Sequence, residues 1–328
     1  MNTHFKNKTI IVTGAAGFIG FHVANALLEQ GADVVGIDNI NDYYDVALKF
    51  SRLDILKKHE KFTFHKVDLA DKKNITAIFE TSKAHYVIHL GAQAGVRYCI
   101  DNPQAYLDSN LVGQMNILEA IREFRPEHTI YASSSSVYGD IKQMPFSTDM
   151  KTDTPVSLYA ATKKSCELLS HSYSSMYDIY LTGLRFFTVY GPYGRPDMAY
   201  FKFTQKILNN EVIDIYNHGN MMRDFTYIND IVEAIIACIP LERPKNETPH
   251  RVLNIGNNNP ESLEKLITLL ENGLNKKAIR NLLPMQTGDV KATYADIEPL
   301  AQLTSCRPKV SLEDGIDRFI QWYRAFYQ

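Results

Sequence analysis

Short apolar runs alternate with segments of helical spacing over the first half of the chain. Runs rich in β-branched and aromatic residues, typical of strands, occupy residues 8–14, 32–39, 61–69, 85–93, 128–134 and 179–187. Apolar residues recur at helical spacing over 18–31, 103–124 and 157–177. Strands that alternate with helices predict an α/β fold, a doubly wound parallel sheet with helices on both faces.

The pattern loosens after about residue 188. Loops rich in Gly, Pro and Asn are followed by a helical segment at 228–239, a strand-like run at 250–256 and a second helical segment at 262–274. We therefore predict an N-terminal domain of residues 1–188 and a smaller C-terminal lobe of residues 189–328. The segment of about 226–257 is expected to return to the main sheet.

Composition adds few constraints. The 328 residues are 45% hydrophobic and 22% charged, with a net charge of −2, so we expect neither a nucleic acid nor a membrane as partner. There is no secretory signal pattern, and no CxxC pair occurs among the cysteines, which favours the cytoplasm and reduced thiols used in packing. The histidines show no metal-ligand spacing, so no metal is predicted. The four cysteines are Cys99, Cys166, Cys238 and Cys306.

A glycine-rich turn joins the first predicted strand to the first predicted helix. In "TGAAGFIG" the glycines are Gly14, Gly17 and Gly20. Such a turn lets a pyrophosphate approach the backbone and the helix N-terminus. Asp38 ends the second strand and can accept hydrogen bonds from an adenosine ribose, which favours NAD over NADP. We predict that residues 1–188 form an NAD-binding Rossmann domain; the alternative is a βα turn without a ligand.

The segment "YAATK" places Tyr159 and Lys163 on one face of a predicted helix. A phenol has a pKa near 10, so a tyrosine base near pH 7 needs a shift of roughly 3 units. A lysine cation and a nicotinamide cation both favour the phenolate. The other tyrosine with a lysine four residues later, Tyr138 with Lys142, contains a glycine and precedes a proline. That second pair is expected in a loop, while the alternative for the first is an ordinary exposed pair.

The glycine turn together with the Tyr–Lys pair resembles the extended short-chain dehydrogenase/reductase superfamily. The resemblance implies that Tyr159, Lys163 and Ser134 are catalytic, with Ser134 bound to the reacting sugar hydroxyl. It also implies that Asn110 steadies the central helix. The coenzyme-binding residues are then expected to be Gly14, Gly17, Phe18, Ile19, Gly20, Asp38, Asn39, Asp68, Leu69, Leu90, Gly91, Ala92, Gln93, Asn110, Ser133, Tyr159, Lys163 and Phe186.

Longer segments resemble one branch of the UDP-galactose 4-epimerase family, the UDP-glucuronate 4-epimerases. They include "VRYCIDNPQAYLDSNLVGQMNILEA", "YASSSSVYG", "LRFFTVYGPYGRPDMA" and "MQTGDVKATYAD". This resemblance implies NAD-dependent inversion at C4 of a UDP-sugar through a 4-keto intermediate. Thr188 and Gln286 replace the Asn and Arg of galactose epimerases. The residues expected at the UDP-sugar are Ser134, Ser135, Ser136, Thr188, Arg195, Arg223 and Asp289.

Several alternatives remain open from the sequence. The sugar can instead be N-acetylhexosamine or hexose, and for Arg195 and Arg223 the alternative is an ordinary exposed arginine. UDP-glucuronate decarboxylases carry Glu before "VYG", where this chain has Ser136 and no carboxylate from 132 to 139. A non-enzymatic NAD-binding protein is a further alternative. The resemblance also implies a homodimer formed through the helices of about 103–124 and 156–176.

Overall fold

The computed structural model describes residues 5–245, 247–286 and 289–328. Residues 1–4 of the predicted N-terminal domain and residues 287–288 of "MQTGDVKATYAD" lie outside this range. The largest sheet has seven strands in the order β10-β6-β5-β4-β1-β2-β3, all paired in parallel. Its strands are β1 Thr9–Thr13, β2 Asp33–Asp38, β3 Phe62–Lys66, β4 Tyr86–His89, β5 His128–Ser134, β6 Leu181–Phe186 and β10 His250–Ile255. The predicted doubly wound α/β fold is confirmed.

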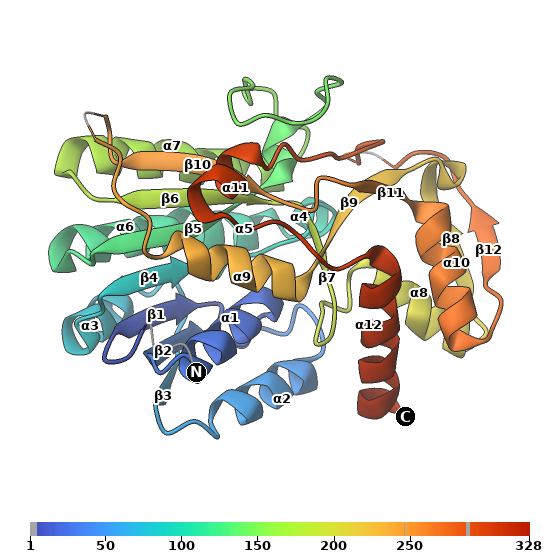
Figure 1. Cartoon of the computed structure of the whole chain (residues 1–328), viewed down its shortest axis with the longest axis horizontal. Helices are drawn as coiled ribbons and strands as arrows, with labels where there is room; N and C mark the ends of the chain where they lie inside the picture. The colour runs from blue at the N-terminus through green and yellow to red at the C-terminus, as the bar shows by residue number, and fades with distance from the viewer. Residues whose placement is uncertain (1–4, 246, 287–288) are drawn as a thin grey trace.

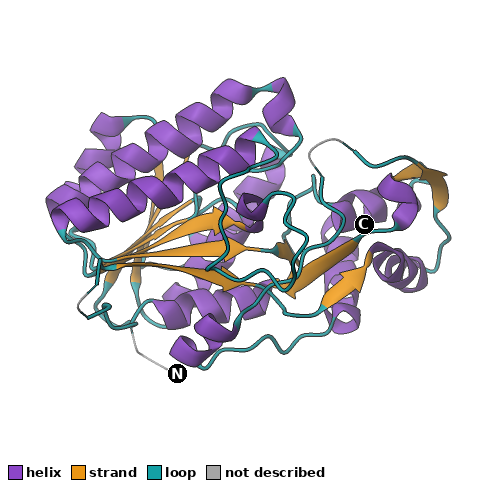
Figure 2. Ribbon diagram, turned by 90° about the horizontal axis from the view of Figure 1, so that it is seen from above, coloured by secondary structure: helices purple, strands orange, loops and turns teal. Residues whose placement is uncertain are grey.

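Helices cover both faces of this sheet (Figure 2). Successive side chains of a strand point to opposite faces, and β1 shows the consequence. Ile10 and Val12 belong to the core that includes α1, whereas Ile11 packs with the helices of the other face. The helices of the first face are α1 Phe18–Glu29, α2 Val46–Leu56 and α9 Ile228–Cys238; those of the second are α3 Lys72–Ser82, α6 Gly113–Phe124 and α7 Leu158–Tyr177.

The helical segment predicted at 103–124 is divided into three parts. Helix α5 Pro103–Tyr106 is followed by a π-helical turn, η1 Leu107–Val112, and then by α6; α4 Tyr98–Asp101 precedes them. Buried Asn110 lies in the π-helical turn, where its amide bonds the backbone of Gln93 in both directions and also donates to Thr162. The π-helical turn therefore fixes the loop after β4 against α7.

The C-terminal half contributes a second, smaller group of elements, on the right of Figure 1. Strand β10 pairs with β6 from His250↔Leu181 to Ile255↔Phe186, so this part of the chain does return to the main sheet. The division into two domains stays a prediction. The remaining strands are β7 Thr188–Tyr190, β8 Val212–Ile215, β9 Met222–Tyr227, β11 Pro260–Ser262 and β12 Ile279–Leu282; the remaining helices are α8 Ala199–Leu208, α10 Leu263–Leu274, α11 Glu298–Thr304 and α12 Leu312–Tyr327.

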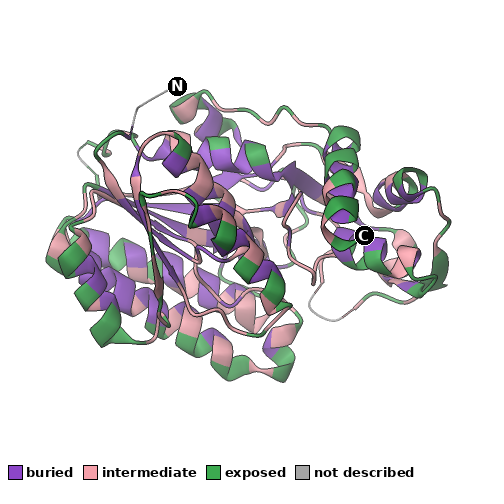
Figure 3. Ribbon diagram, turned by 90° about the horizontal axis from the view of Figure 1, so that it is seen from below, coloured by how far each residue is buried: buried purple, intermediate pink, exposed green. Residues whose placement is uncertain are grey.

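Figure 3 shows that the inner strands of the main sheet are largely buried while the helices expose their outer faces; the edge strand β3 has no fully buried residue. Burial on both faces explains why the strands read as near-continuous apolar runs rather than as alternating ones. Among the described residues, no helix combines the length and the apolar character needed to cross a membrane.

Candidate active site

A cavity opens at the carboxyl ends of the parallel strands, between the main sheet and the loop that follows β7. Beside β1, the chain order reverses: β2 and β3 lie on one side, and β4, β5, β6 and β10 on the other. Doubly wound sheets bind ligands at such a point. The predicted site residues that line the cavity are Gly14, Gly17, Phe18, Ile19, Gly20, Asp38, Asn39, Asp68, Leu69, Leu90, Gly91, Ala92, Gln93, Ser133, Ser134, Tyr159, Lys163, Phe186 and Arg195.

The glycine turn is packed so closely that side chains would not fit. Gly14 has φ +72°, and a Cβ there would lie 2.9 Å from the backbone nitrogen of Gly91. A Cβ on Gly20 would lie 2.0 Å from the carbonyl oxygen of Gly14. Gly17 precedes α1 without a side-chain cap, and no acidic residue occupies the first turn. Free N–H groups and the helix dipole at this end suit an anion, so the turn fits the diphosphate of NAD.

Asp38 points back at the same turn. Its carboxylate accepts hydrogen bonds from the Ala16 N–H at 3.1 Å and the Ile40 N–H at 2.8 Å. Burial raises the pKa of Asp38, while the Ile40 hydrogen bond and the Lys49 charge oppose that rise. Asn39 donates to Asp68 at 2.7 Å. These groups gather carboxylate and amide oxygens at the ends of β2 and β3, as a ribose and an adenine require.

The three predicted catalytic residues meet at the ends of β5 and α7. Tyr159 and Lys163 occupy the first turns of α7, whose N-cap Ser157 accepts from the Ala160 N–H. The buried Lys163 ammonium donates to the carbonyl of Ala132 at 3.0 Å. Ser134 ends β5, and all three catalytic residues line the cavity. A phenol, an ammonium and a hydroxyl therefore face the same cavity.

His89 lies nearby beneath the cavity. Burial, and after it the positive charge of Lys163, lower the pKa of His89 to about 3. The neutral ring is within 2.7 Å of the Thr13 hydroxyl, which accepts from the Gly91 N–H. His89 thus supports, through Thr13, the backbone at Gly91, which lines the cavity.

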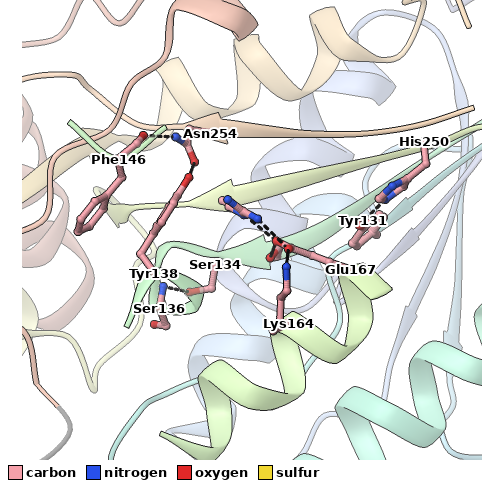
Figure 4. A network of polar contacts seen from close by, with 11 residues as sticks. Tyr131, Ser134, Ser136, Tyr138, Phe146, Lys164, Glu167, His250 and Asn254 are labelled. Carbon is pink, nitrogen blue, oxygen red and sulfur yellow. Dashed lines mark hydrogen bonds and ion pairs between the residues drawn. The ribbon is translucent and has the colours of Figure 1, made fainter. Parts of the chain in front are cut away.

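An ion pair lies next to the serine segment, Ser133–Ser136 (Figure 4). Glu167 on α7 accepts from Arg185 on β6 at 2.8 and 2.9 Å and from the Ser133 hydroxyl at 2.6 Å. Burial by itself would raise the pKa of Glu167, but the hydrogen bonds and charge of Arg185 outweigh it and lower that pKa. The carboxylate is consequently committed to a structural role.

The same network continues into the "VYG" segment. The Arg185 guanidinium lies 4.8 Å from the ring centre of Tyr138, whose hydroxyl donates to Asn254 at 2.7 Å. Asn254 in turn donates to the carbonyl of Phe146 at 2.6 Å. Neither Glu167 nor Asn254 was predicted from the sequence. Glu167 could have been predicted to lie near the site, because it follows Lys163 by four residues and so lies on the same helix face.

The residues predicted to contact the UDP-sugar are divided between two places. Arg195 lines the cavity and bonds Asp197 at 2.9 and 2.5 Å. Ser135 and Ser136 lie in the short helix Ser135–Tyr138, where the Ser136 N–H donates to Ser134. Thr188 begins β7. Ser135, Ser136 and Thr188 follow the ends of β5 and β6 but are not among the residues that line the cavity.

Arg223 and Asp289 belong to a separate cluster on the C-terminal side. They form an ion pair at 2.9 Å, and Arg97 lies 3.6 Å from the same carboxylate. The Arg97 guanidinium also lies 4.7 Å from the ring centre of Tyr216. Sequence reasoning missed Arg97 and Tyr216, because their meeting depends on long-range packing. Two arginines that share one carboxylate, one of them against an aromatic ring, have the chemistry of a nucleoside diphosphate site.

Carboxylates are unevenly distributed around the cavity. Among the described residues that line it, the acids are Asp38 and Asp68, which follow β2 and β3. Tyr159, Lys163 and Ser134 lie on the β5 side. The cavity therefore combines a phenol, a cation and a hydroxyl at one end with acids only at the other.

The comparisons with known proteins agree with this arrangement. The model of the NAD dependent epimerase/dehydratase family matches residues 10–256. Protein CapI of Staphylococcus aureus is 50% identical over 97% of this chain and 99% of its own length. The probable UDP-glucuronate 4-epimerase of Rhizobium meliloti is 46% identical over 97% of each chain. The crystal structure of a Bacillus cereus UDP-glucuronic acid 4-epimerase with UDP-glucuronic acid and NAD has a TM-score of 0.91 at 34% identity, covering 97% of this chain and 100% of that one.

The chain belongs to the NAD dependent epimerase/dehydratase family. It is an NAD-dependent enzyme of the isomerase class. The predictions of the superfamily and of NAD as coenzyme are confirmed.

Proposed function

We propose that this enzyme is a UDP-sugar 4-epimerase and that its substrate is UDP-glucuronate, which it interconverts with UDP-galacturonate. One observation carries the proposal: Tyr159, Lys163 and Ser134 gather at one end of the cavity, and the cavity's described acids, Asp38 and Asp68, lie at the other. An oxidised sugar held there meets a base but no acid able to drive elimination. The names of the relatives support the choice of sugar.

Tyr159 acts as the base in this proposal. Its phenolate removes the proton from the sugar 4-hydroxyl, with Ser134 bridging the two oxygens. The positive charge of the buried Lys163 favours the phenolate form of a nearby phenol.

NAD, when bound, accepts the hydride from C4 and returns it to the other face of the ring. Between these transfers, Tyr159 holds the proton removed from the 4-oxygen and then gives it back. Phe186 lines the cavity beside the end of β6 and excludes water from the exposed ketone. The residues that hold the coenzyme are the glycine turn, Asp38 and the segment Leu90–Gln93.

We assign recognition of the sugar carboxylate to the hydroxyls of Ser135, Ser136 and Thr188. Neutral donors satisfy a carboxylate without an ion pair, so the sugar ring can turn over during the reaction. The diphosphate and uracil are assigned to Arg195, Arg223 and Asp289, and the ion pair of Arg223 orients it at the cluster described above. The N-terminal domain of residues 1–188, with about 226–257, is then the coenzyme domain, and residues 189–328 mainly form the substrate lobe.

The sugar assignment is tested by proton NMR on three separate substrates: UDP-glucuronate, UDP-N-acetylglucosamine and UDP-glucose. We expect the galacto epimer from UDP-glucuronate, with a kcat/KM at least tenfold above that for the other two. Faster turnover of either neutral sugar would transfer the assignment to that sugar. Release of carbon dioxide with formation of UDP-xylose would identify a decarboxylase instead.

Replacing Thr188 by Val tests the proposed hydrogen bond between its hydroxyl and the sugar carboxylate. A lost hydrogen bond to a charged group costs about 1.5–3 kcal/mol, so kcat/KM for UDP-glucuronate should fall by at least tenfold. The valine keeps the branched shape at the start of β7, so slow turnover of UDP-glucose should not fall. Unchanged turnover of UDP-glucuronate would remove Thr188 from the site.

We further propose that the enzyme works in the cytoplasm as a homodimer. The four cysteines of the described structure are free, which suits a reducing compartment. The helices of the proposed interface expose apolar side chains that a second copy would cover. These are Leu107, Val112, Leu168 and Met176.

A further inference from the structure

Arg52 on α2 is a fully buried cation whose described hydrogen-bond acceptors are all neutral. Its side chain is 0% exposed, and no described carboxylate lies within ion-pair distance of it. Its two terminal nitrogens instead donate to four neutral oxygens. These are the carbonyl of Ala16 at 2.7 Å, the hydroxyl of Tyr44 at 2.7 Å, and the carbonyls of Tyr193 and Gly194 at 2.7 and 3.2 Å. Burial of an unpaired charge is costly, so the interactions that it makes must hold something in place.

The oxygens that Arg52 binds come from two segments far apart in the sequence. Ala16 lies in the glycine turn, and both of its backbone polar groups are held: Asp38 accepts from its N–H, and Arg52 donates to its carbonyl. Tyr193 and Gly194 immediately precede Arg195, which lines the cavity. One guanidinium therefore ties the coenzyme turn to the loop that carries a substrate-facing arginine.

A second link runs parallel to the first. The hydroxyl of Tyr43, beside Tyr44, donates to Asp197 at 3.2 Å. Asp197 holds Arg195 through two hydrogen bonds. The Tyr193 ring packs against Phe21 of α1, with the ring centres 5.1 Å apart. The loop of residues 193–197 is thus fastened to the coenzyme side by a cation, a carboxylate and an aromatic contact.

We propose that Arg52 is a positioning residue that clasps the 193–197 loop onto the coenzyme turn, retaining NAD through turnover and coupling its binding to the position of Arg195. This inference rests on the proposed epimerase function. Epimerisation uses the same coenzyme twice on one sugar, first to take a hydride and then to return it. Coenzyme lost between these transfers would leave a ketone that cannot be reduced, so slow dissociation has a direct use.

The test measures NAD dissociation from the purified holoenzyme after dilution into a trap for free NAD. Arg52→Lys keeps the charge, but a single ammonium lacks the planar fork that reaches both segments. We expect NAD to dissociate at least tenfold faster, with more of the turnovers ending in a released 4-keto sugar. The matched control is Arg122→Lys on α6, where the arginine pairs with Glu119 of the same helix; its rate should stay at the wild-type value.

A purely structural role predicts a different result. In that case, the melting temperature of NAD-free Arg52→Lys would fall. The increase in melting temperature on adding NAD and the rate of NAD dissociation would both match the wild type. This result would overturn the proposal. Tyr43→Phe breaks the second link without disturbing a buried charge. It should speed NAD release about threefold, and an unchanged rate would refute the role assigned to the second link.

NAD dissociation is measured without any sugar, which separates this inference from the assigned reaction. A wild-type enzyme that epimerises no UDP-sugar but still shows Arg52-dependent NAD retention would refute the proposed function and support the clasp. An enzyme that epimerises a UDP-sugar but retains NAD equally well without Arg52 would support the proposed function and refute the role of Arg52.

Discussion

At the residue scale, the site depends on a pair of charges that never meets the substrate. Glu167 and Arg185 are each about 4% exposed and bond one another twice. Ser133, the first of the four serines, donates to Glu167, and Arg185 lies against the Tyr138 ring. The charge pair therefore holds the segment that carries Ser134, and Ser133 and Ser134 line the cavity.

Replacing Glu167 by Gln should destabilise the protein by about 3 kcal/mol, because Arg185 keeps its charge in a buried site and loses its partner. The measurement is urea unfolding near pH 7, with exposed Glu80→Gln of α3 as the control. A loss below about 1 kcal/mol would show that the pair is dispensable.

The same variant has a defined pH dependence. The pKa of Glu167 is lowered in the folded protein, so its stabilising contribution is fully present above the unfolded value of about 4.3 and is lost as the pH falls through the folded value. The stability difference between wild type and Glu167→Gln should therefore be constant above about pH 5 and shrink below it. A difference that grows on acidification would contradict the assignment.

At the element scale, the sequence predicted the parts whose pattern is simple. The apolar strands, the glycine turn and α7 follow from periodicity and spacing. Helix α2 was missed because Lys49 and Arg52 face inward, and a pattern analysis takes such residues as surface. Strand β4 ends at His89, earlier than expected, because the next residues leave the sheet to line the cavity.

Gly20→Ala tests the turn as an element. The added methyl would meet the Gly14 carbonyl at 2.0 Å, so the turn or α1 must shift and the diphosphate site opens. We expect NAD affinity to fall at least 100-fold in a calorimetric titration. Ala26→Ser, on the same helix, should bind NAD as the wild type does; normal affinity in Gly20→Ala would show that the turn does not hold the coenzyme.

At the scale of the whole molecule, strand order decides which predicted residues can meet. The reversal beside β1 could be anticipated from a doubly wound fold, and with it the edge of the sheet where ligands bind. Arg195 was expected near that edge only through the family resemblance. The approach of Tyr43 and Met198 was not expected, because it depends on how the loop after β2 and the loop before α8 pack. The sequence thus predicted the cavity residues on the main sheet better than those on the loops that pack against it.

The proposed dimer is tested at this scale. Leu168 on α7 is 60% exposed, and glutamate at that position would bring a charge into an apolar interface. Sedimentation of wild type should show a dimer, and Leu168→Glu should shift the population to monomer. A wild-type monomer at micromolar concentration would contradict the assembly.

In the proposed reaction, the Tyr159 phenolate moves the proton at the sugar 4-oxygen. The most direct measurement is proton NMR of UDP-glucuronate with wild type and with Tyr159→Phe, alongside the NAD content of both proteins. We expect the galacto epimer to form with wild type, and Tyr159→Phe to be at least 1,000-fold slower, about 4 kcal/mol, while still binding NAD. Tyr159→Phe that epimerises at the wild-type rate would contradict the account.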